Sequence, residues 1–332
     1  RFSENDLLRF CYHYFASYSI TAHGIQGTGY NYDITADDVF NNFVKIACHE
    51  LRESSERLLG FAKEFVDALS LLSRTLADSI ESIPGNQDLE RLLRWQGPSA
   101  SVYPLLIAAA AENILDATLQ RKIEILDMRV YKIRGTDPKA DLYRDAIAAI
   151  RRDPMNRAGI NSAINWFITR FGPDAAIDSY LRTDVFRNAY TKYVLWEFSS
   201  FRSPENGNGD YDLYRDLQVE HIFPQEPSFD VTSYGFENEE DYFAHIHQFG
   251  NLCLLERSIN PSAGNDAPLA KAVQHYGRSQ VRATRLLGEE IQNSGFSKAK
   301  LQVRTDQIVN FVKQHWPIGI PEVTPSAQSG GS

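Results

Sequence analysis

Cysteine is scarce in this chain, and so are long apolar runs. The three cysteines, Cys11, Cys48 and Cys253, stand at no ligand-like spacing, so we expect reduced, mostly buried thiols in a cytoplasmic protein. The longest apolar run, residues 102–111, falls short of the roughly 20 residues that span a bilayer. No signal peptide is visible, and we expect no membrane partner.

Positive charge is also in short supply. The chain has 34 Lys and Arg residues against 43 Asp and Glu residues, a formal net charge of −9. A protein that holds nucleic acid through bulk charge is basic. Any contact with DNA must therefore come from local patches of positive charge.

Motifs of several common enzyme classes are missing from the sequence. It has no GxxxxGK[ST] phosphate loop and no GxGxxG after a strand, so nucleotide hydrolysis is not expected from these residues. HExxH and paired cysteines are missing too, which ranks a zinc hydrolase low.

The first two hundred residues are predicted to be helical. The chain of 332 residues is long for one core and suggests two domains or more. Ser3 and Thr35 begin N-cap patterns. One apolar helix face is predicted from Leu58, Ala62, Phe65, Leu69, Leu72, Leu76 and Ile80. Further helices are expected near residues 87–96, 100–120, 121–134, 139–151, 159–171, 173–182 and 184–199.

The second half differs from the first in composition and in its predicted secondary structure. Gly, Asn and Pro cluster at residues 203–210 and indicate a loop or domain boundary. The expected elements after it are a strand (217–223), an acidic helix (238–248), a strand (251–256), a loop leading into a helix (260–277) and two helices (278–293 and 298–315). The chain begins at Arg1 rather than Met, so we expect a fragment of a larger protein whose N-terminal part is missing.

One group of Glu, His and Asn residues could form a catalytic site. Glu220 and His221 end the first strand, and on their own an ordinary packed pair explains them. Asn251 and Asn260 bracket the second strand, although asparagine is a poor strand former. If the two strands pair, Glu220 and Asn260 converge as hard oxygen ligands for a divalent ion such as Mg²⁺. His221, with an ordinary pKa near 6.5, stands beside them to take a proton from water.

This pattern resembles the ββα-metal finger of HNH (His-Me finger) nucleases. The fuller run, "EHIFPQ…FGNLCLLERSINPSAGNDAPLAKAV", resembles the C-terminal nuclease domain of GmrSD-type modification-dependent restriction proteins, including the related nuclease of phosphorothioation-linked phage defence systems. The resemblance covers about residues 185–315 and is strongest over 219–271. It implies a mainly α fold in which a ββα-metal unit, at about 217–276, is embedded in helices.

The resemblance assigns roles to individual residues. It implies that His221 is the general base, that Asn251 orients the histidine backbone, and that Glu220 and Asn260 bind the metal, Mg²⁺ or Mn²⁺. Asn265 and Lys271 match a further "N…K" of this subgroup, and Lys271 could contact a phosphate. Glu220 stands where Asp is common, so its longer arm leaves the metal preference open.

The implied function is that of a metal-dependent DNA endonuclease, which nicks DNA, in a bacterial anti-phage restriction protein. Residues 1–200 would then be a helical scaffold that contacts DNA or another domain, residues 201–318 the HNH nuclease domain, and residues 319–332 a disordered tail. The resemblance also implies a missing ParB-like nucleotide-binding sensor domain. The alternative is a helical DNA-binding or regulatory module whose finger is weakly active or acts on RNA.

Other candidates are less specific. Arg278, Arg282 and Arg285 recur at helical spacing, and Lys298, Lys300 and Arg304 follow. They form a possible DNA-contacting strip near the finger, or equally a solvated helix face. His245 and His247 point apart if they lie on one helix, so we expect surface or packing roles for them.

Overall fold

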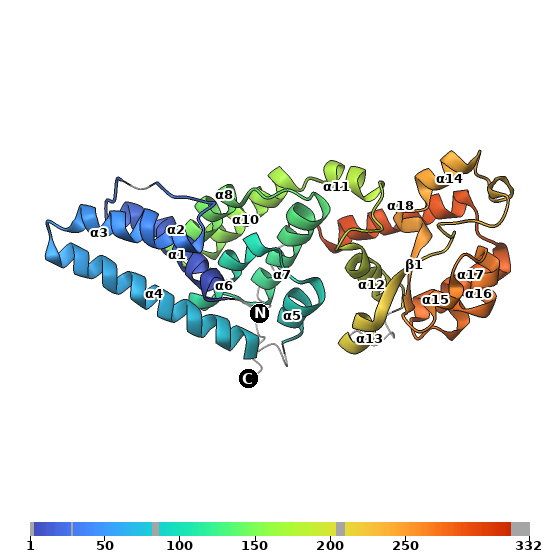
Figure 1. The fold of residues 1–332 in the computed structure, drawn as a ribbon, viewed down its shortest axis with the longest axis horizontal. Coiled ribbons are helices and arrows are strands. Elements are labelled where there is room, and N and C mark those ends of the chain that lie inside the picture. The colour runs from blue at the N-terminus through green and yellow to red at the C-terminus, as the bar shows by residue number, and fades with distance from the viewer. Residues whose placement is uncertain (1–2, 28, 82–85, 204–209, 320–332) are drawn as a thin grey trace, which may run out of the picture.

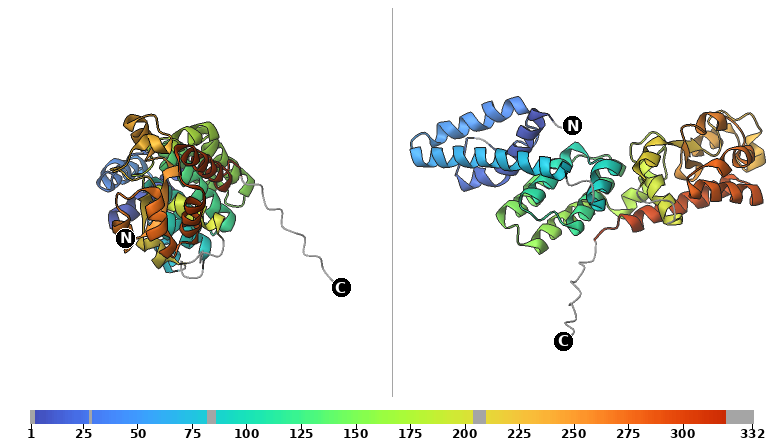
Figure 2. Two further views of the ribbon diagram at one scale, coloured as in Figure 1. Left: turned by 90° about the vertical axis from the view of Figure 1, so that its right-hand side faces the viewer. Right: turned by 90° about the horizontal axis from the view of Figure 1, so that it is seen from below.

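The computed structural model describes residues 3–27, 29–81, 86–203 and 210–319. The described chain is elongated, with the N-terminal helices at one end and the two strands at the other (Figures 1 and 2). The fold is mainly α, as predicted. Most of the predicted boundary at 203–210 and of the predicted tail at 319–332 lies outside the described residues.

The N-terminal end is a layer of helices that begin where their caps stand. Ser3 accepts from the Asp6 N–H while the Asp6 carboxylate accepts from the Ser3 N–H, a capping box that starts the first helix. Thr35 caps the second helix through the Asp38 N–H. The elements are α1 (Glu4–Ala22), α2 (Ala36–Val39), η1 (Phe40–Val44), α3 (Lys45–Leu51) and α4 (Ser55–Glu81).

Helix α4 is the long helix along the edge of this layer (Figure 1). Phe61 and Leu72 are buried on its inner face, and Leu58, Phe65, Leu69 and Leu76 pack against the core. The predicted face is therefore largely confirmed. Ala62 is exposed instead, because Phe61 takes the inward position, and the side chain of Ile80 lies outside the described part of the helix.

The middle of the chain is a second group of helices. Its elements are α5 (Gln87–Glu90), η2 (Arg91–Gln96), η3 (Ala100–Val102), α6 (Tyr103–Ala111), α7 (Ala117–Leu126), η4 (Asp127–Ile133), α8 (Lys139–Leu142), η5 (Tyr143–Ile147), α9 (Ala148–Arg152), α10 (Arg157–Phe171) and α11 (Asp174–Leu181).

Two predicted helices of this region have different bounds. The helix expected over 100–120 is interrupted, because Asn113 adopts a positive φ of 56° and Asp116 caps a new helix. The helix expected over 184–199 begins only at Thr191. Residues 184–190 form turns instead, since the Asp184 side chain accepts from the Phe186 N–H and the Val185 N–H donates to the carbonyl of His247.

The second half contains the sheet. Its elements are α12 (Thr191–Arg202), α13 (Tyr211–Asp216), β1 (Leu217–His221), η6 (Val231–Tyr234), α14 (Glu239–His245), η7 (Phe249–Asn251), β2 (Leu252–Glu256), α15 (Asn260–Ala263), α16 (Pro268–Gln274), η8 (Tyr276–Arg278), α17 (Arg282–Ser294) and α18 (Lys298–His315). β1 and β2 pair antiparallel, with Glu220 opposite Cys253 and His221 opposite Leu252. The predicted order of strand, insertion, strand and helix is confirmed.

The helix expected over 278–293 also has different bounds. Arg278 ends the short turn η8, and α17 starts at Arg282. The intervening residues are extended because the buried Glu256 carboxylate accepts from the Ser279 hydroxyl and from the Gln280 N–H. A buried carboxylate needs such partners, and they replace helical hydrogen bonds here.

The sheet separates two groups of packed apolar side chains. Leu252 and Leu254 face the larger core, which reaches from the N-terminal helices to α18. Cys253 and Leu255 face a smaller core around Phe223 and α16. This alternation is the period of two expected of a strand covered on both faces.

The predictions about the cysteines and about membrane-spanning segments can be compared with the structure. All three cysteines are free thiols, and Cys11 and Cys253 are buried. Among the helices in the described part of the chain, none combines the length and the apolar character needed to cross a membrane.

Candidate active site

The end of β1 places Glu220 and His221 side by side in the chain but on opposite faces of the sheet. Side chains of consecutive strand residues point in opposite directions. Glu220 lies opposite Cys253 and faces the smaller core, whereas His221 contacts Phe186 of the turns that precede α12. Both are buried, with 7 % and 4 % of their surfaces exposed.

Glu220 is held by a buried lysine of α16. The Lys271 Nζ lies 2.6 Å from Glu220 Oε1 and also donates to the carbonyl of His221 at 2.6 Å. Burial raises the pKa of Glu220, and the Lys271 charge offsets part of that rise. The Lys271 side chain is 1 % exposed, so Lys271 fixes the end of β1, and the phosphate contact suggested for it stays a prediction.

His221 is enclosed by two side chains that sequence reasoning did not select. Its Nε2 lies 3.0 Å from Nδ1 of His247, and its ring centroid lies 4.2 Å from that of Phe186. Burial, with the nearby His247 and Lys271, lowers the pKa of His221 to about 3. The imidazole is therefore neutral near pH 7 and has a lone pair with which to accept a proton.

Asn251 fastens the turn that follows His221. Its side-chain oxygen accepts from the Phe223 N–H at 2.7 Å, and its amide nitrogen donates to the carbonyls of Phe223 (2.9 Å) and Ile246 (2.8 Å). Asn251 is fully buried, so these bonds satisfy the groups it buries. This asparagine thereby joins the two ends of the insertion and orients the backbone next to the histidine.

Asn260 and Asn265 lie after β2. The amide nitrogen of Asn260 donates to Gln218 at 3.0 Å, and that of Asn265 donates to Glu226 at 3.2 Å. Gln218 precedes Glu220 by two residues and so points to the same face of the sheet. The structure brings Asn260 to the face that Glu220 occupies, but its observed bond is with Gln218.

The basic residues that follow β2 do not form one strip. Arg278 lies outside α17, so only Arg282 and Arg285 share a helix face, and Arg285 donates to the carbonyl of Ser279 at 2.5 Å. Of the following group, Lys298 pairs with Asp241 and Lys300 donates to the carbonyls that end α17. DNA contact by Arg278, Arg282 and Arg285 stays a prediction.

The sequence predicts a surface or packing role for His247 and assigns no role to Phe186. The Phe186 and His247 rings lie nearly parallel, 5.4 Å between centroids with 12° between planes. Nothing in the spacing of the sequence distinguishes His247 from His245, whose ring instead contacts the Asp241 carbonyl. The pairing depends on the turn at residues 184–190, which only the tertiary structure brings to the sheet.

A metal ion would find few ligands here. No group of three or more His, Cys, Asp or Glu side chains within the described residues could hold one. Glu220 and Asn260 offer a carboxylate and an amide oxygen, which suit Mg²⁺ because that ion keeps several waters and accepts one or two carboxylates. In the described structure the Glu220 carboxylate pairs with Lys271 and the Asn260 amide with Gln218, so metal binding by these two residues stays a prediction.

Among the comparisons with known proteins, one family model matches, over a range that includes this site. No curated protein and no solved structure matches the chain. Residues 174–311 match the model of a family described as GmrSD restriction endonucleases, C-terminal domain. The matched range holds every residue considered above and begins before the predicted domain boundary near residue 200. The predicted resemblance is confirmed for residues 174–311, which are similar to the GmrSD restriction endonuclease C-terminal domain.

Proposed function

We propose that the chain is a metal-dependent DNA endonuclease that nicks its substrate as part of bacterial restriction of phage DNA. The family supports nuclease chemistry on DNA. The HNH type of site, the metal and the nicking outcome are parts of the proposal. From the family alone, we include as partner a ParB-like nucleotide-binding sensor domain of the same protein.

One arrangement carries the proposal. A neutral histidine ends a strand next to a carboxylate, and a buried asparagine fixes the turn after it. A general base must be unprotonated at working pH and held in place, and it accepts a proton best when its pKa lies near that pH. Neutral His221, with its backbone bound by Lys271 and the next turn bound by Asn251, meets the first two conditions. Because burial is what lowers its pKa to about 3, the third condition is met only when the side chains that cover the ring move away.

The reaction follows from these side chains. His221 accepts the proton of the attacking water, and Asn251 keeps the histidine backbone from shifting as the proton moves. Glu220 and Asn260 would hold the divalent ion, which when bound supplies positive charge to the scissile phosphate and its leaving oxygen. A single such centre cuts one strand.

The alternative of a weakly active finger has its own support. His221 is only 4 % exposed, and Phe186 and His247 cover its ring. A phosphate group can reach this histidine only after the turn at residues 184–190 moves. The chain by itself would then act chiefly as a helical DNA-binding or regulatory module.

Plasmid nicking tests the proposal. With Mg²⁺ or Mn²⁺ we expect the chain to convert supercoiled plasmid to the nicked form, and we expect His221→Ala and Asn251→Ala to lose at least about 100-fold in rate, typical of a lost general base. His49→Ala, a change of an exposed histidine on α3, is the control. Equal nicking by His221→Ala would contradict the assignment. Cleavage of an RNA of the same sequence, but not of DNA, would support the alternative.

A further inference from the structure

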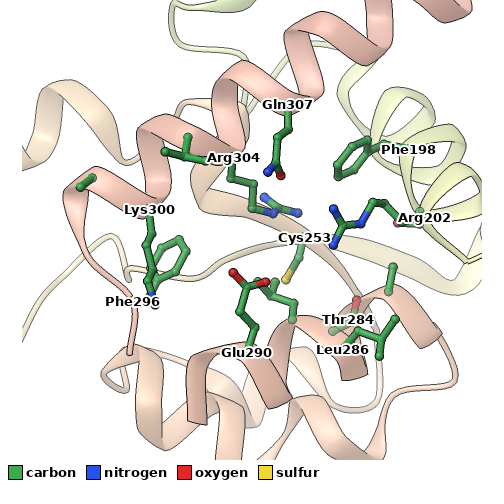
Figure 3. A pocket seen from close by; sticks show the side chains of 15 residues that line it. Phe198, Arg202, Cys253, Thr284, Leu286, Glu290, Phe296, Lys300, Arg304 and Gln307 are labelled. Atoms are coloured by element: carbon green, nitrogen blue, oxygen red, sulfur yellow. The ribbon is translucent and has the colours of Figure 1, made fainter. Parts of the chain in front are cut away.

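A cavity of about 360 Å³ lies between α12, β2, α17 and α18, apart from the candidate active-site residues. Cys253 stands at its floor, and Phe198 and Phe296 give it apolar walls (Figure 3). Leu287 also lines it. This volume is at the lower end of the range for small-molecule pockets. The cavity is too small for a duplex, and its volume is in the range for a ligand of the size of one nucleotide.

The cavity is positively charged although the chain is acidic. Arg202, Lys300 and Arg304 line it against a single acid, Glu290, a formal excess of two positive charges. Figure 3 shows the guanidinium groups of Arg202 and Arg304 directed into the cavity. Within the described residues no carboxylate lies within 4.0 Å of either guanidinium group. Burial, and to a smaller extent the charge of Arg202, lowers the pKa of Arg304.

Arg304 also connects the cavity to the candidate active site. Its Nη1 donates to the carbonyls of Phe249 (3.0 Å), Gly250 (3.0 Å) and Leu252 (2.6 Å), which flank Asn251. The same Asn251 binds the turn after His221. An anion that attracts the Arg304 side chain therefore acts on the turn that holds the proposed general base.

We propose that this cavity binds a nucleoside monophosphate, with the phosphate between Arg202 and Arg304 and the base against Phe198 and Phe296. Guanidinium groups recognise phosphate through charge-assisted hydrogen bonds, and aromatic walls accept a base by stacking. The nucleotide is either free in solution or the 5′-phosphorylated end of a strand. The effect on the Asn251 turn rests on the proposed function, whereas binding itself does not.

Calorimetry on the full chain tests binding with AMP, adenosine, inorganic phosphate and a 5′-phosphorylated dA10 strand. We expect AMP or the strand to bind at least tenfold more tightly than adenosine or phosphate alone. Arg202 is exposed, and its guanidinium group makes no hydrogen bond or ion pair within the described residues. Arg202→Glu should therefore weaken that binding at least tenfold without disturbing the fold. Leu286→Trp, which fills the cavity from its rim, should do the same.

Arg215→Glu, an equal change of charge at an exposed arginine of α13, is the matched control and should bind normally. Binding of AMP identifies a free nucleotide, and binding of the strand alone identifies a strand end. Absence of binding by both, or equal weakening by Arg202→Glu and Arg215→Glu, overturns the proposal.

The effect on the active site has a separate measurement. On binding we expect slower amide hydrogen exchange at residues 249–252, and we expect the same in His221→Ala, which lacks the proposed base. Unchanged exchange at these residues overturns the connection through Arg304. Because neither calorimetry nor exchange requires cleavage, failure of the nuclease assay leaves both results interpretable.

Discussion

At the scale of single residues, the buried charges of this chain are held by specific partners. Lys271 neutralises Glu220 at the end of β1, and Glu256 accepts from the residues between η8 and α17. Buried ion pairs add little net stability compared with apolar residues, but removal of one partner leaves an isolated charge. Such positions therefore respond strongly to single substitutions.

Lys271→Met should lower the free energy of unfolding by about 3–5 kcal/mol, because it leaves the Glu220 carboxylate buried without its partner. Urea denaturation measures the loss. Glu220→Gln in the same background should restore part of it, since a neutral amide costs less to bury. Lys63→Met, at an exposed position on α4, is the control. A loss that Glu220→Gln does not reduce would contradict this account.

His13 should make the N-terminal helices sensitive to acid. Burial, with the nearby Arg9 and Lys139, lowers its pKa from 6.5 to about 3, against a smaller opposing effect of Asp33. Between pH 6.5 and pH 3 the unfolded chain binds a proton that the folded chain does not, so stability falls as the pH falls. From pH 6.5 to pH 5 this residue alone should remove about 2 kcal/mol.

His13→Gln should therefore lose about 2 kcal/mol less than the wild type between pH 6.5 and pH 5. Urea denaturation at both pH values measures the difference. His49→Gln, at an exposed position, should retain the wild-type dependence. An identical dependence in His13→Gln would show that this histidine does not titrate as proposed.

At the scale of elements, close backbone approach fixes η7 against α18. A Cβ atom at Gly250 would collide with the Leu301 carbonyl and the Thr305 side chain, and the Gly250 N–H donates to the Thr305 hydroxyl at 3.0 Å. Glycine is required there by contact, not by its φ angle. The position of Asn251, and through it of the turn after His221, thus depends on α18.

Gly250→Ala should lower the free energy of unfolding by about 1–3 kcal/mol, the usual cost of forcing an extra methyl group into a packed site. Thermal or urea denaturation measures it. Gly277→Ala is the matched control, because a Cβ there meets no atom within 4 Å. Equal effects of the two substitutions would rule out a specific contact with α18.

At the scale of the whole molecule, buried polar bonds join the middle helices to the C-terminal end of α18. Glu124 of α7 accepts from Tyr193 at 3.1 Å and from the Trp316 indole at 2.9 Å, and it pairs with Arg121. Arg129 donates to the carbonyl of Trp316 at 2.6 Å. The Tyr193 bond connects the matched range 174–311 to α7, and the two Trp316 bonds attach the residue that follows α18 to the same middle helices.

Glu124→Ala should lower the free energy of unfolding by about 3 kcal/mol, since it leaves buried donors without an acceptor. Burial alone would raise the pKa of Glu124, but Arg121, Arg91 and the Trp316 bond lower it overall. The ionised Glu124 carboxylate therefore stabilises the folded protein fully above its ordinary pKa of 4.5. This stabilisation is lost as the pH falls through the lower pKa of the folded state.

Fluorescence of buried Trp316 and urea denaturation at pH 7 and pH 3 measure both effects of Glu124→Ala. Glu53→Ala, at an exposed position in the N-terminal layer, is the control. If Glu124→Ala were as stable as the wild type at pH 7, the bonds between α7 and α18 would not hold the two parts together.

Much of the candidate site could be predicted because its signals are local. Ser3 and Thr35 cap helices with neighbouring N–H groups, and Glu220, His221 and Asn251 stand in short runs with strand and turn character. The bounds near residues 113, 184 and 280 could not be predicted in the same way. At each of these places another interaction replaces helical hydrogen bonds. It is a positive φ angle at Asn113, a bond to the His247 carbonyl near residue 184, and bonds to the Glu256 carboxylate near residue 280.

By itself the sequence determined the helical class, the order of the two strands and the resemblance of residues 174–311 to a restriction endonuclease family. Periodicity, caps and a compact motif each depend on residues that are close together in the chain. Only the tertiary structure decided that Lys271 would bind Glu220, that Phe186 and His247 would cover His221, and that Arg304 would face a cavity. These contacts join residues 26 or more positions apart, and their geometry follows from how whole helices pack against the sheet.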